Sequence, residues 1–266
     1  MLNAKVAVGG ALVGAFILGA IVVGFSSAEP ERAVAPFSER QQEEIGEIVR
    51  EYLMANPEVI IEAVNAFSER ERIAEEERIR LSARSNLERL LDPQTAYIAG
   101  KNPEAAKVAV VELFDYHCGF CKRAVGLMQE IAEDDEDVKV VFRELPILRQ
   151  ESEYAAEMAL AARDQGKFLE LHFAMMEAPG VLTKERIHAM AREHGLDVEQ
   201  MEKAVKEDVA ITAAIADNHA LAQEMGVTGT PAFIIASLNG EYVEIVNGFR
   251  AEDVRRKIEE AKKAAG

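Results

Sequence analysis

The two cysteines, Cys118 and Cys121, are the residues of this sequence best suited to redox chemistry. They are the only cysteines in 266 residues, and only Gly119 and Phe120 separate them. Thiols at this spacing can close a disulfide, and a thiolate can attack the disulfide of another molecule. Two other interpretations stay open: a structural disulfide, and half of a zinc site, for which the five histidines offer no paired spacing.

The sequence on either side of the cysteines predicts the elements that position them. Residues 108–114 form an apolar run with one acid, typical of a strand that is buried on both faces. After the cysteines, apolar residues at helical spacing predict a helix. We therefore expect an exposed Cys118 at a helix N-terminus, where unpaired N–H groups favour the thiolate. Cys121, one turn further in, should resolve a mixed disulfide.

Glu112 and His117 are the other candidate site residues near the cysteines. Glu112 interrupts the apolar strand six residues before Cys118. Strand alternation puts it on the same face as Phe114, so burial would raise its pKa and let it serve as the base for Cys121. An exposed acid at the sheet edge is the alternative. His117 directly precedes Cys118 and is a candidate for contact with substrate.

A second stretch, far along the sequence, supports the redox interpretation. Thr230-Pro231 opens the strand-like run 232–236, and a proline before a central strand marks a special backbone. With the strand, C-x-x-C and helix, this layout resembles the DsbA-like thiol:disulfide oxidoreductases. The resemblance covers residues 96–266 and needs no cofactor. It implies that Pro231 is a cis proline facing the cysteines and that Thr230 lines the substrate groove with Gly119, Phe120 and His117.

The remaining patterns fit this fold class, an α/β thioredoxin fold with a helical insertion. Residues 138–143 predict a second core strand, and residues 151–226 predict an insertion of five helices. A hairpin turning at Asn239-Gly240 and a last helix over 251–264 close the chain. An all-helical extension precedes the domain.

The N-terminus predicts a location outside the cytoplasm. Residues 6–25 carry no charge, and small residues before Ala28 suit a cleavage site, so residues 1–28 are a signal peptide or a membrane anchor. Both outcomes place the body in the bacterial periplasm, where disulfides persist. Residues 29–36 hold two prolines and read as a linker.

Residues 37–67 predict two short amphipathic helices, with Asn56 as the N-cap of the second. Helices this short must pack on the redox domain or on another copy. Residues 68–95, rich in Glu and Arg, predict a solvated helical connector that ends at Asp92-Pro93. This layout resembles the ScsC-type proteins linked to copper tolerance, some of which assemble three subunits through this segment. The resemblance implies a homo-oligomer, with a trimer as one form.

Several functions remain open. The net charge of −17 argues against nucleic acid as a partner. Gly119-Phe120 lacks the histidine of the strongly oxidising DsbA members, and threonine before the proline occurs in the isomerase branch, so the resemblance favours a disulfide isomerase or reductase. The alternatives are a dithiol oxidase, a Cu(I)-binding protein with Cys118 and Cys121 as ligands, and a helical scaffold or peptide-binding module. The implied partners are cysteine-containing client proteins and a membrane redox protein, either a DsbD/ScsB-like reductase or a DsbB-like oxidase.

Overall fold

The computed structural model describes residues 37–266. They divide into two compact units, one ending at Glu62 and the other beginning at Ala63. The predicted signal peptide or anchor and the linker lie outside the described residues. Within the described part of the chain, no helix is both long and apolar enough to cross a bilayer.

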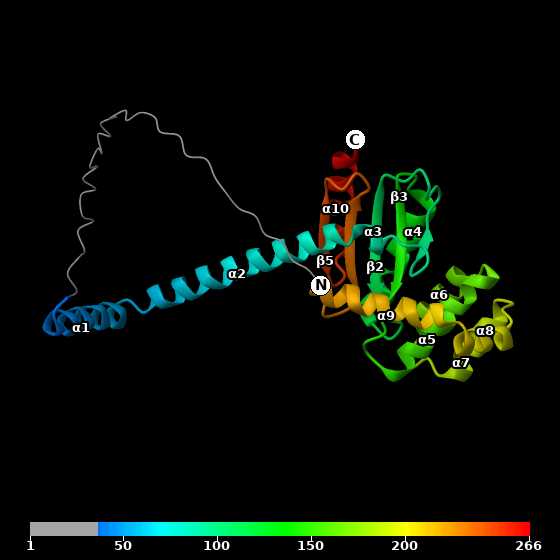
Figure 1. Ribbon diagram of the computed structural model, residues 1–266, viewed down its shortest axis with the longest axis horizontal. Helices are drawn as coiled ribbons and strands as arrows, with labels where there is room; N and C mark the ends of the chain where they lie inside the picture. Colours follow the sequence, from blue (N-terminus) through cyan, green and yellow to red (C-terminus); the bar gives the residue numbers. More distant parts are fainter. Residues whose placement is uncertain (1–36) are drawn as a thin grey trace, which may run out of the picture. The chain divides into compact units, whose positions relative to one another are not determined.

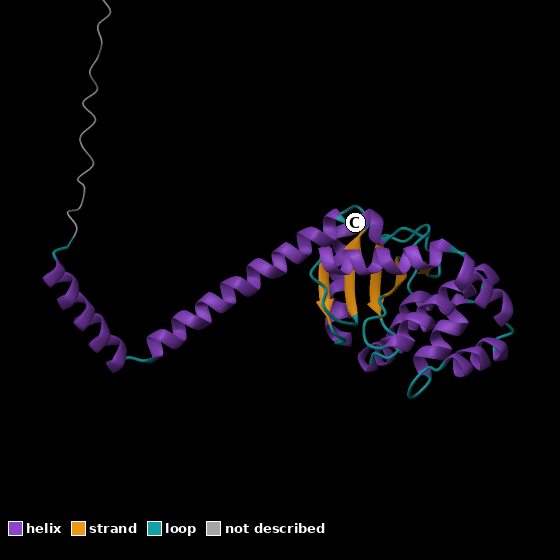
Figure 2. Ribbon diagram, turned by 60° about the horizontal axis from the view of Figure 1, so that its bottom comes forward, coloured by secondary structure: helices purple, strands orange, loops and turns teal. Residues whose placement is uncertain are grey.

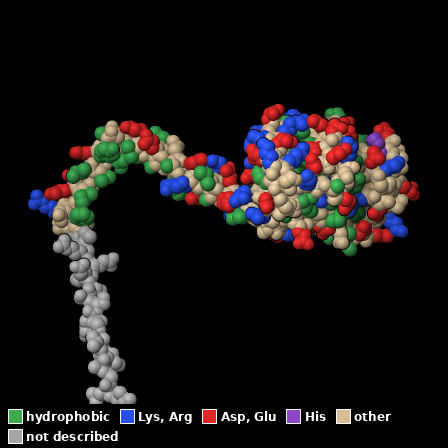
Figure 3. All heavy atoms as spheres, turned by 90° about the horizontal axis from the view of Figure 1, so that it is seen from above, with side chains coloured by type: hydrophobic (Ala, Val, Ile, Leu, Met, Phe, Trp, Pro, Cys, Tyr) green, Lys and Arg blue, Asp and Glu red, His purple; other side chains and the backbone are tan. Residues whose placement is uncertain are grey.

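The first unit consists of α1 (Glu39–Ala55) and the start of α2 (Glu58–Ser85). Ser38 begins α1 with a capping box, because its hydroxyl and the Gln41 side chain satisfy each other's backbone N–H groups. The break at Asn56-Pro57 was predicted, but Asn56 plays a different part: its side-chain amide donates to Tyr52 O (2.9 Å) and so caps the end of α1. Apolar side chains gather on α1 and the first turns of α2 (Figure 3), and many are exposed, among them Ile48 and Ile61.

The second unit contains five strands and most of the helices (Figure 1). The strands are β1 (Tyr97–Ala99), β2 (Val108–Phe114), β3 (Val138–Glu144), β4 (Ala232–Ser237) and β5 (Val243–Asn247). The helices after α2 are α3 (Leu87–Leu90), α4 (Gly119–Asp134), α5 (Gln150–Ala161), α6 (Phe168–Glu177), α7 (Lys184–Glu193), α8 (Val198–Glu207), α9 (Val209–Glu224) and α10 (Ala251–Ala265), with a 3₁₀ turn, η1 (Ala162–Gln165), after α5. The predicted fold class is confirmed, and β1 is the one strand that the sequence patterns did not indicate.

The strands form one mixed sheet in the order β1-β3-β2-β4-β5. β2 and β3 are parallel, whereas the pairs β1–β3, β2–β4 and β4–β5 are antiparallel. β2 therefore lies at the centre, and all seven of its residues are buried. This explains its lack of apolar–polar alternation, since helices cover both faces of the sheet (Figure 2).

The two faces of the sheet have separate cores. Val110, Phe114 and Phe142 point to the face that is covered by α4, α10 and the helices α5 to α8. The intervening residues of the same strands, such as Val111 and Val141, point to the other face. There they pack against α9 and against residues just before β1, since Ala83 and Leu90 are fully buried.

The predicted connector therefore differs from a solvated helix. α2 runs without a break through residue 67 and ends at Ser85, and its last turn joins the second core together with α3. The Glu and Arg side chains of α2 are exposed and pair along the helix, as Arg72 does with Glu69 and Glu76. The charged side chains in the middle of α2 are exposed, as the sequence predicted. The few apolar positions of its last turn, which pack into the domain, could not be distinguished in so charged a sequence.

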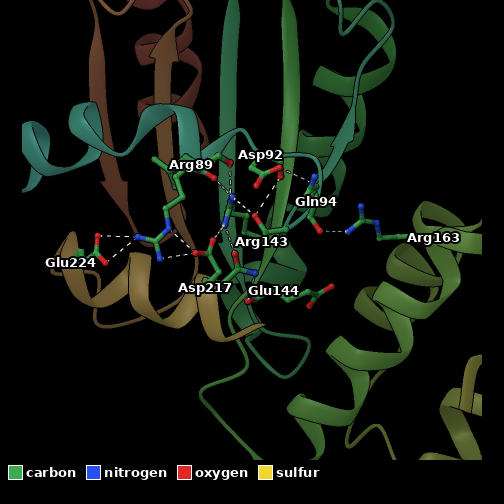
Figure 4. A network of polar contacts seen from close by, with 11 residues as sticks. Arg89, Asp92, Gln94, Arg143, Glu144, Arg163, Asp217 and Glu224 are labelled. Carbon is green, nitrogen blue, oxygen red and sulfur yellow. Dashed lines mark hydrogen bonds and ion pairs between the residues drawn. The ribbon is translucent and has the colours of Figure 1, made fainter. Parts of the chain in front are cut away.

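Arg143 fixes this segment to the domain from the inside (Figure 4). Its side chain, fully buried in β3, donates to the carbonyl oxygens of Leu90 (2.8 Å) and Arg89 and to Thr95 Oγ1 (2.9 Å). It also binds the α9 side chains Asn218 (2.5 Å) and Asp217 (3.2 Å). A buried guanidinium is stable only when its donors are satisfied. Arg143 therefore depends both on residues 89–95 and on α9 for its hydrogen-bond acceptors.

Candidate active site

Cys118 lies at the N-cap of α4, directly after β2. Its backbone is extended, and its sulfur accepts the N–H of Cys121 at 3.2 Å. The predicted position at a helix N-terminus is confirmed. The predicted exposure is not, because Cys118 is only 4% exposed. One of its contacts is with Thr230 O, 3.2 Å from the sulfur, a residue so distant in sequence that a local pattern could not reveal it.

Thr230 and Pro231 stand opposite the cysteine pair, although they are remote from it in sequence. The Thr230–Pro231 peptide bond is cis. When Cys118 is protonated, its thiol donates to Thr230 O at 3.2 Å. The backbone just before Pro231 therefore flanks the sulfur, where an extended peptide would have to pass.

The surroundings of Cys118 favour its thiolate. Its pKa is lowered to about 6, first because the Cys121 thiol donates to its sulfur, and further by the Thr230 side chain and the backbone N–H groups of Cys121 and Phe120; burial opposes the shift. The Thr230 hydroxyl is buried with no hydrogen-bond partner among the described residues, so it acts on the sulfur as a nearby dipole. At neutral pH, Cys118 is mostly ionised and nucleophilic.

Cys121 and Glu112 are buried near Cys118, and their pKa values are raised, whereas that of Cys118 is lowered. Burial, the bond to Cys118 and the charge of Glu112 raise the pKa of Cys121. Burial raises the pKa of Glu112 to about 8, and the negative charge of Cys118 adds to this effect. The predicted burial of Glu112 on the α4 face is confirmed, with 3% exposure. Its Oε1 has no hydrogen-bond partner among residues 37–266.

A buried acid of this kind makes stability depend on pH. Glu112 keeps its proton in the folded state up to about pH 8, whereas the unfolded chain releases it above its ordinary value of 4.5. The contribution of Glu112 to stability should therefore fall as pH rises from 4.5 to 8, by about 5 kcal/mol, because a tenfold change in proton affinity is worth about 1.4 kcal/mol. Urea unfolding of the protein and of Glu112→Gln at pH 4.5, 6.5 and 8.5 should show a difference that grows with pH. A constant difference would contradict the assignment.

The rim of the site carries apolar side chains. Phe120 is 52% exposed, and the Arg123 guanidinium stacks over its ring at 4.1 Å. Ile147 and Leu148, in the loop after β3, are also exposed. Gly119 has open space where a Cβ would project, so this position could hold a side chain. These residues suit contact with the apolar parts of a client.

Asp115 holds this rim in place, a role that the sequence analysis did not identify. The buried carboxylate accepts the N–H groups of Ile147 and Leu148 (2.9 Å each) on Oδ2. On Oδ1 it accepts the His117 N–H (2.7 Å) and the Ser152 hydroxyl (2.8 Å). The one available signal was an acid directly after a buried strand, next to the cysteines.

His117 makes its contacts within the domain. Its side chain is only 3% exposed, and both ring nitrogens have partners within the domain. Burial lowers its pKa. These contacts give His117 a structural part in the site, and its predicted contact with a substrate stays a prediction.

No group of three or more His, Cys, Asp or Glu side chains in the described range 37–266 could hold a metal ion. The soft donors at the site are the two sulfurs alone. The geometry is therefore that of a dithiol poised for exchange: a stabilised thiolate, a buried partner thiol, and a buried carboxyl between the pair and the sheet.

Comparison with known proteins agrees with this geometry. The model of the DSBA-like thioredoxin domain matches residues 109–259, and that of the copper resistance protein ScsC N-terminal domain matches residues 41–74. A thioredoxin-like oxidoreductase from Silicibacter pomeroyi is 39% identical, with a TM-score of 0.59, over 66% of this chain and 96% of that one. BcfH from Salmonella enterica Typhimurium is 28% identical, with a TM-score of 0.70, over 85% of this chain and 97% of its own.

Two further matches are to an ScsC protein and to an Na(+)/H(+) antiporter. ScsC of Proteus mirabilis, in a transitional conformation, is 26% identical with a TM-score of 0.59, over 85% of this chain and 98% of that one. The Na(+)/H(+) antiporter NhaA 1 of Salinispora arenicola is 31% identical over 54% of this chain, which spans only 22% of that protein's length. The match over more than half of the chain, together with the fold and the cysteine pair, shows that the chain belongs to the DSBA-like thioredoxin domain family, with an N-terminal segment of the ScsC type.

Proposed function

We propose that this protein exchanges disulfides with client proteins in the periplasm, as a disulfide isomerase or reductase. The observation that carries the proposal is the Cys118 sulfur, which has a pKa of about 6, accepts the Cys121 N–H and lies 3.2 Å from Thr230 O. A sulfur so placed is a nucleophile at neutral pH beside a backbone that can align an extended peptide.

In the first step, the Cys118 thiolate attacks one sulfur of a client disulfide. A bond forms between Cys118 Sγ and that sulfur, the client's S–S bond breaks, and the other client sulfur leaves as a thiolate. The number of disulfides is unchanged. If a different client thiolate then attacks the mixed disulfide, Cys118 leaves as a thiolate again, and the client has a new pairing with no net transfer of electrons.

The second route is resolution by Cys121. Its thiol loses a proton and its sulfur attacks Cys118 Sγ, so that the Cys118–Cys121 disulfide forms and the client leaves with two thiols. The client has gained two electrons and the protein has lost two. Glu112 lies close enough to influence both cysteines, and its carboxylate form is the base that can accept the Cys121 proton.

The Cys118 thiol is less acidic than that of the strong oxidant DsbA, which favours isomerisation or reduction over dedicated oxidation. A more acidic thiol stabilises the reduced form and makes the disulfide more oxidising. The pKa of about 6 lies between about 7 for thioredoxin and about 3.5 for the strong oxidant DsbA. Gly119 and Phe120 contribute no polar side chain to the sulfur. We expect a reduction potential between about −270 and −120 mV.

The proposal also includes partners. A membrane reductase of the DsbD/ScsB type would return two electrons to the pair after each net reduction of a client. Residues around α1 would assemble copies of the chain, three being the number that the ScsC resemblance implies. The support for assembly is the match of residues 41–74 and the exposure of apolar side chains such as Ile48 (66%) and Met54 (75%), which water does not favour.

Binding of Cu(I) is the second candidate, favoured by the match to a copper resistance protein. Cys118 and Cys121 would be the soft ligands. Bathocuproine competition separates the two functions, because a copper carrier would hold Cu(I) tightly and show little exchange with client disulfides.

Recovery of active ribonuclease A from its scrambled, fully oxidised form tests the main proposal. We expect the reduced protein to accelerate recovery at least about tenfold over glutathione alone, because a thiolate held beside a peptide groove reacts faster than a free thiol. The matched assay begins with reduced ribonuclease A and the oxidised protein. Fast oxidation of reduced ribonuclease A, with no faster recovery of the scrambled form, would identify the protein as an oxidase instead.

A further inference from the structure

The residues that flank the cysteine pair both hold the same short stretch of the insertion. Residues 178–182, here called the wall segment, connect α6 to the start of α7. Lys122, which follows Cys121, donates from Nζ to Ala178 O at 2.8 Å. His117, which precedes Cys118, accepts the Leu182 N–H on Nε2 at 3.0 Å. The wall segment is thus tied to the redox pair at both of its ends.

The Lys122 end is a helix cap. The ammonium also donates to Met175 O (3.1 Å) and Met176 O (2.9 Å), the last carbonyl groups of α6. α6 has no basic residue of its own in its last turn, so Lys122 supplies the positive charge that a helix C-terminus favours. All three ammonium protons have acceptors, which fixes the beginning of the wall segment against α4.

The His117 end depends on one tautomer. A backbone N–H can only donate, so the Nε2 atom that faces Leu182 must carry a lone pair. A neutral imidazole then has its proton on Nδ1, which lies 2.9 Å from Ser152 Oγ. The Ser152 hydroxyl in turn donates to Asp115 Oδ1 at 2.8 Å. Each donor in this series has one acceptor, and the series joins β2, α5 and the wall segment.

Between its ends, the wall segment is held but not covered. Arg186 donates to Pro179 O (2.8 Å) and Val181 O (2.5 Å). Pro179 and Gly180 are exposed, while Leu182 is buried. Leu182 also lines a cavity of about 470 Å³ together with Tyr154 and Lys184. The wall segment therefore presents a fixed, accessible edge next to the residues that flank the cysteines.

We propose that the wall segment contacts the client chain during exchange, and that His117 and Lys122 are positioning residues that hold it there. The proposal rests on the proposed exchange activity. Thr230 borders Cys118 on one side, and the wall segment would border the client on the other. His117 then acts on client binding through Leu182 and does not act on the sulfur itself.

Two substitutions of His117 separate this role from a general effect on folding. In His117→Gln the side-chain oxygen can reach the position of Nε2 and accept the Leu182 N–H. In His117→Asn the shorter side chain reaches Ser152 but not Leu182. We expect His117→Asn to lower the hydrogen-exchange protection of the Leu182 amide about tenfold and to raise KM for scrambled ribonuclease A about fivefold, with little change in kcat, because a buried donor loses its partner. His117→Gln should restore both values.

The expected spectroscopic signature is independent of catalysis. The imidazole ¹⁵N spectrum of the wild-type protein should show a non-protonated Nε2 and a protonated Nδ1, and the opposite assignment would overturn the proposal. It would also fail if the Leu182 amide stayed protected in His117→Asn, if His117→Gln behaved like His117→Asn, or if the amide were freed with KM unchanged. Absence of isomerase activity alone would reject the proposed function but would leave the tautomer and exchange results to be judged separately.

Discussion

Replacing Cys121 with serine should leave client proteins covalently attached to Cys118. The Cys118 thiolate can still attack a client disulfide, but the sulfur that would displace the client is missing. Spontaneous release then depends on another thiol reaching the sulfur of Cys118, a residue that is only 4% exposed. We expect mixed disulfides to accumulate to a large fraction of the protein, and non-reducing gels with mass spectrometry of trypsin digests would show Cys118 joined to client cysteines.

The matched control is Cys118→Ser, which should form no mixed disulfides and lose all exchange activity. Burial raises the pKa of Cys121, and the residue is only 1% exposed, so we expect that it does not replace Cys118 as the nucleophile. Adducts on Cys121 in the Cys118→Ser protein, or an equal yield of adducts from both variants, would show that the roles of the two cysteines have been assigned wrongly.

Removing residues 1–95 should unfold the redox domain, even though the family match begins at residue 109. The shortened chain lacks Leu90, which is fully buried, and three of the groups that bind Arg143. Loss of a buried leucine costs about 2–5 kcal/mol. Arg143 keeps Asp217 and Asn218, but each of its buried donors that loses an acceptor costs about 1–3 kcal/mol more. The sum is comparable with the whole stability of a typical domain, about 5–15 kcal/mol.

The measurement is urea unfolding followed by circular dichroism, with a chain that begins at Ala63 as the control. That chain keeps α3, Arg89 and the last turns of α2, so it should unfold cooperatively near the midpoint of the full protein. If the proposed assembly through the first unit is correct, light scattering should give it the mass of a single chain. A stable, cooperative domain from the chain that begins at Ala96 would show that the Arg143 network contributes little.

The parts of the site that could be predicted from sequence are those governed by local patterns. The continuous apolar run placed β2 at the centre of the sheet, and the spacing after Cys121 placed Cys118 at the start of α4. Alternation along β2 placed Glu112 on the face of Phe114 but left an exposed acid as the alternative, and the central position of β2 accounts for its burial. Each of these predictions rests on the local spacing of apolar and polar residues that is typical of a strand or a helix.

What the sequence did not reveal depends on contacts between distant segments. Cys118 contacts the distant Thr230, and the use of both His117 nitrogens depends on Ser152 and Leu182. Arg143 looks like an ordinary charged residue at the end of a strand until α3 and α9 surround it. The charged pattern of α2 also concealed Ala83, a single small residue on the buried side of its last turn.

The slight accessibility of the Cys118 sulfur has a consequence for which disulfides it can attack. If the proposed exchange activity is correct, a flexible, extended client segment can bring its sulfur to so buried a cysteine, whereas a disulfide held in a rigid native surface cannot. Cys118 would then react with the disulfides of clients that are still flexible and would leave those of folded proteins intact, without recognising a particular sequence. The accessibility of the client's disulfide to Cys118 would be enough to separate folded from unfolded clients.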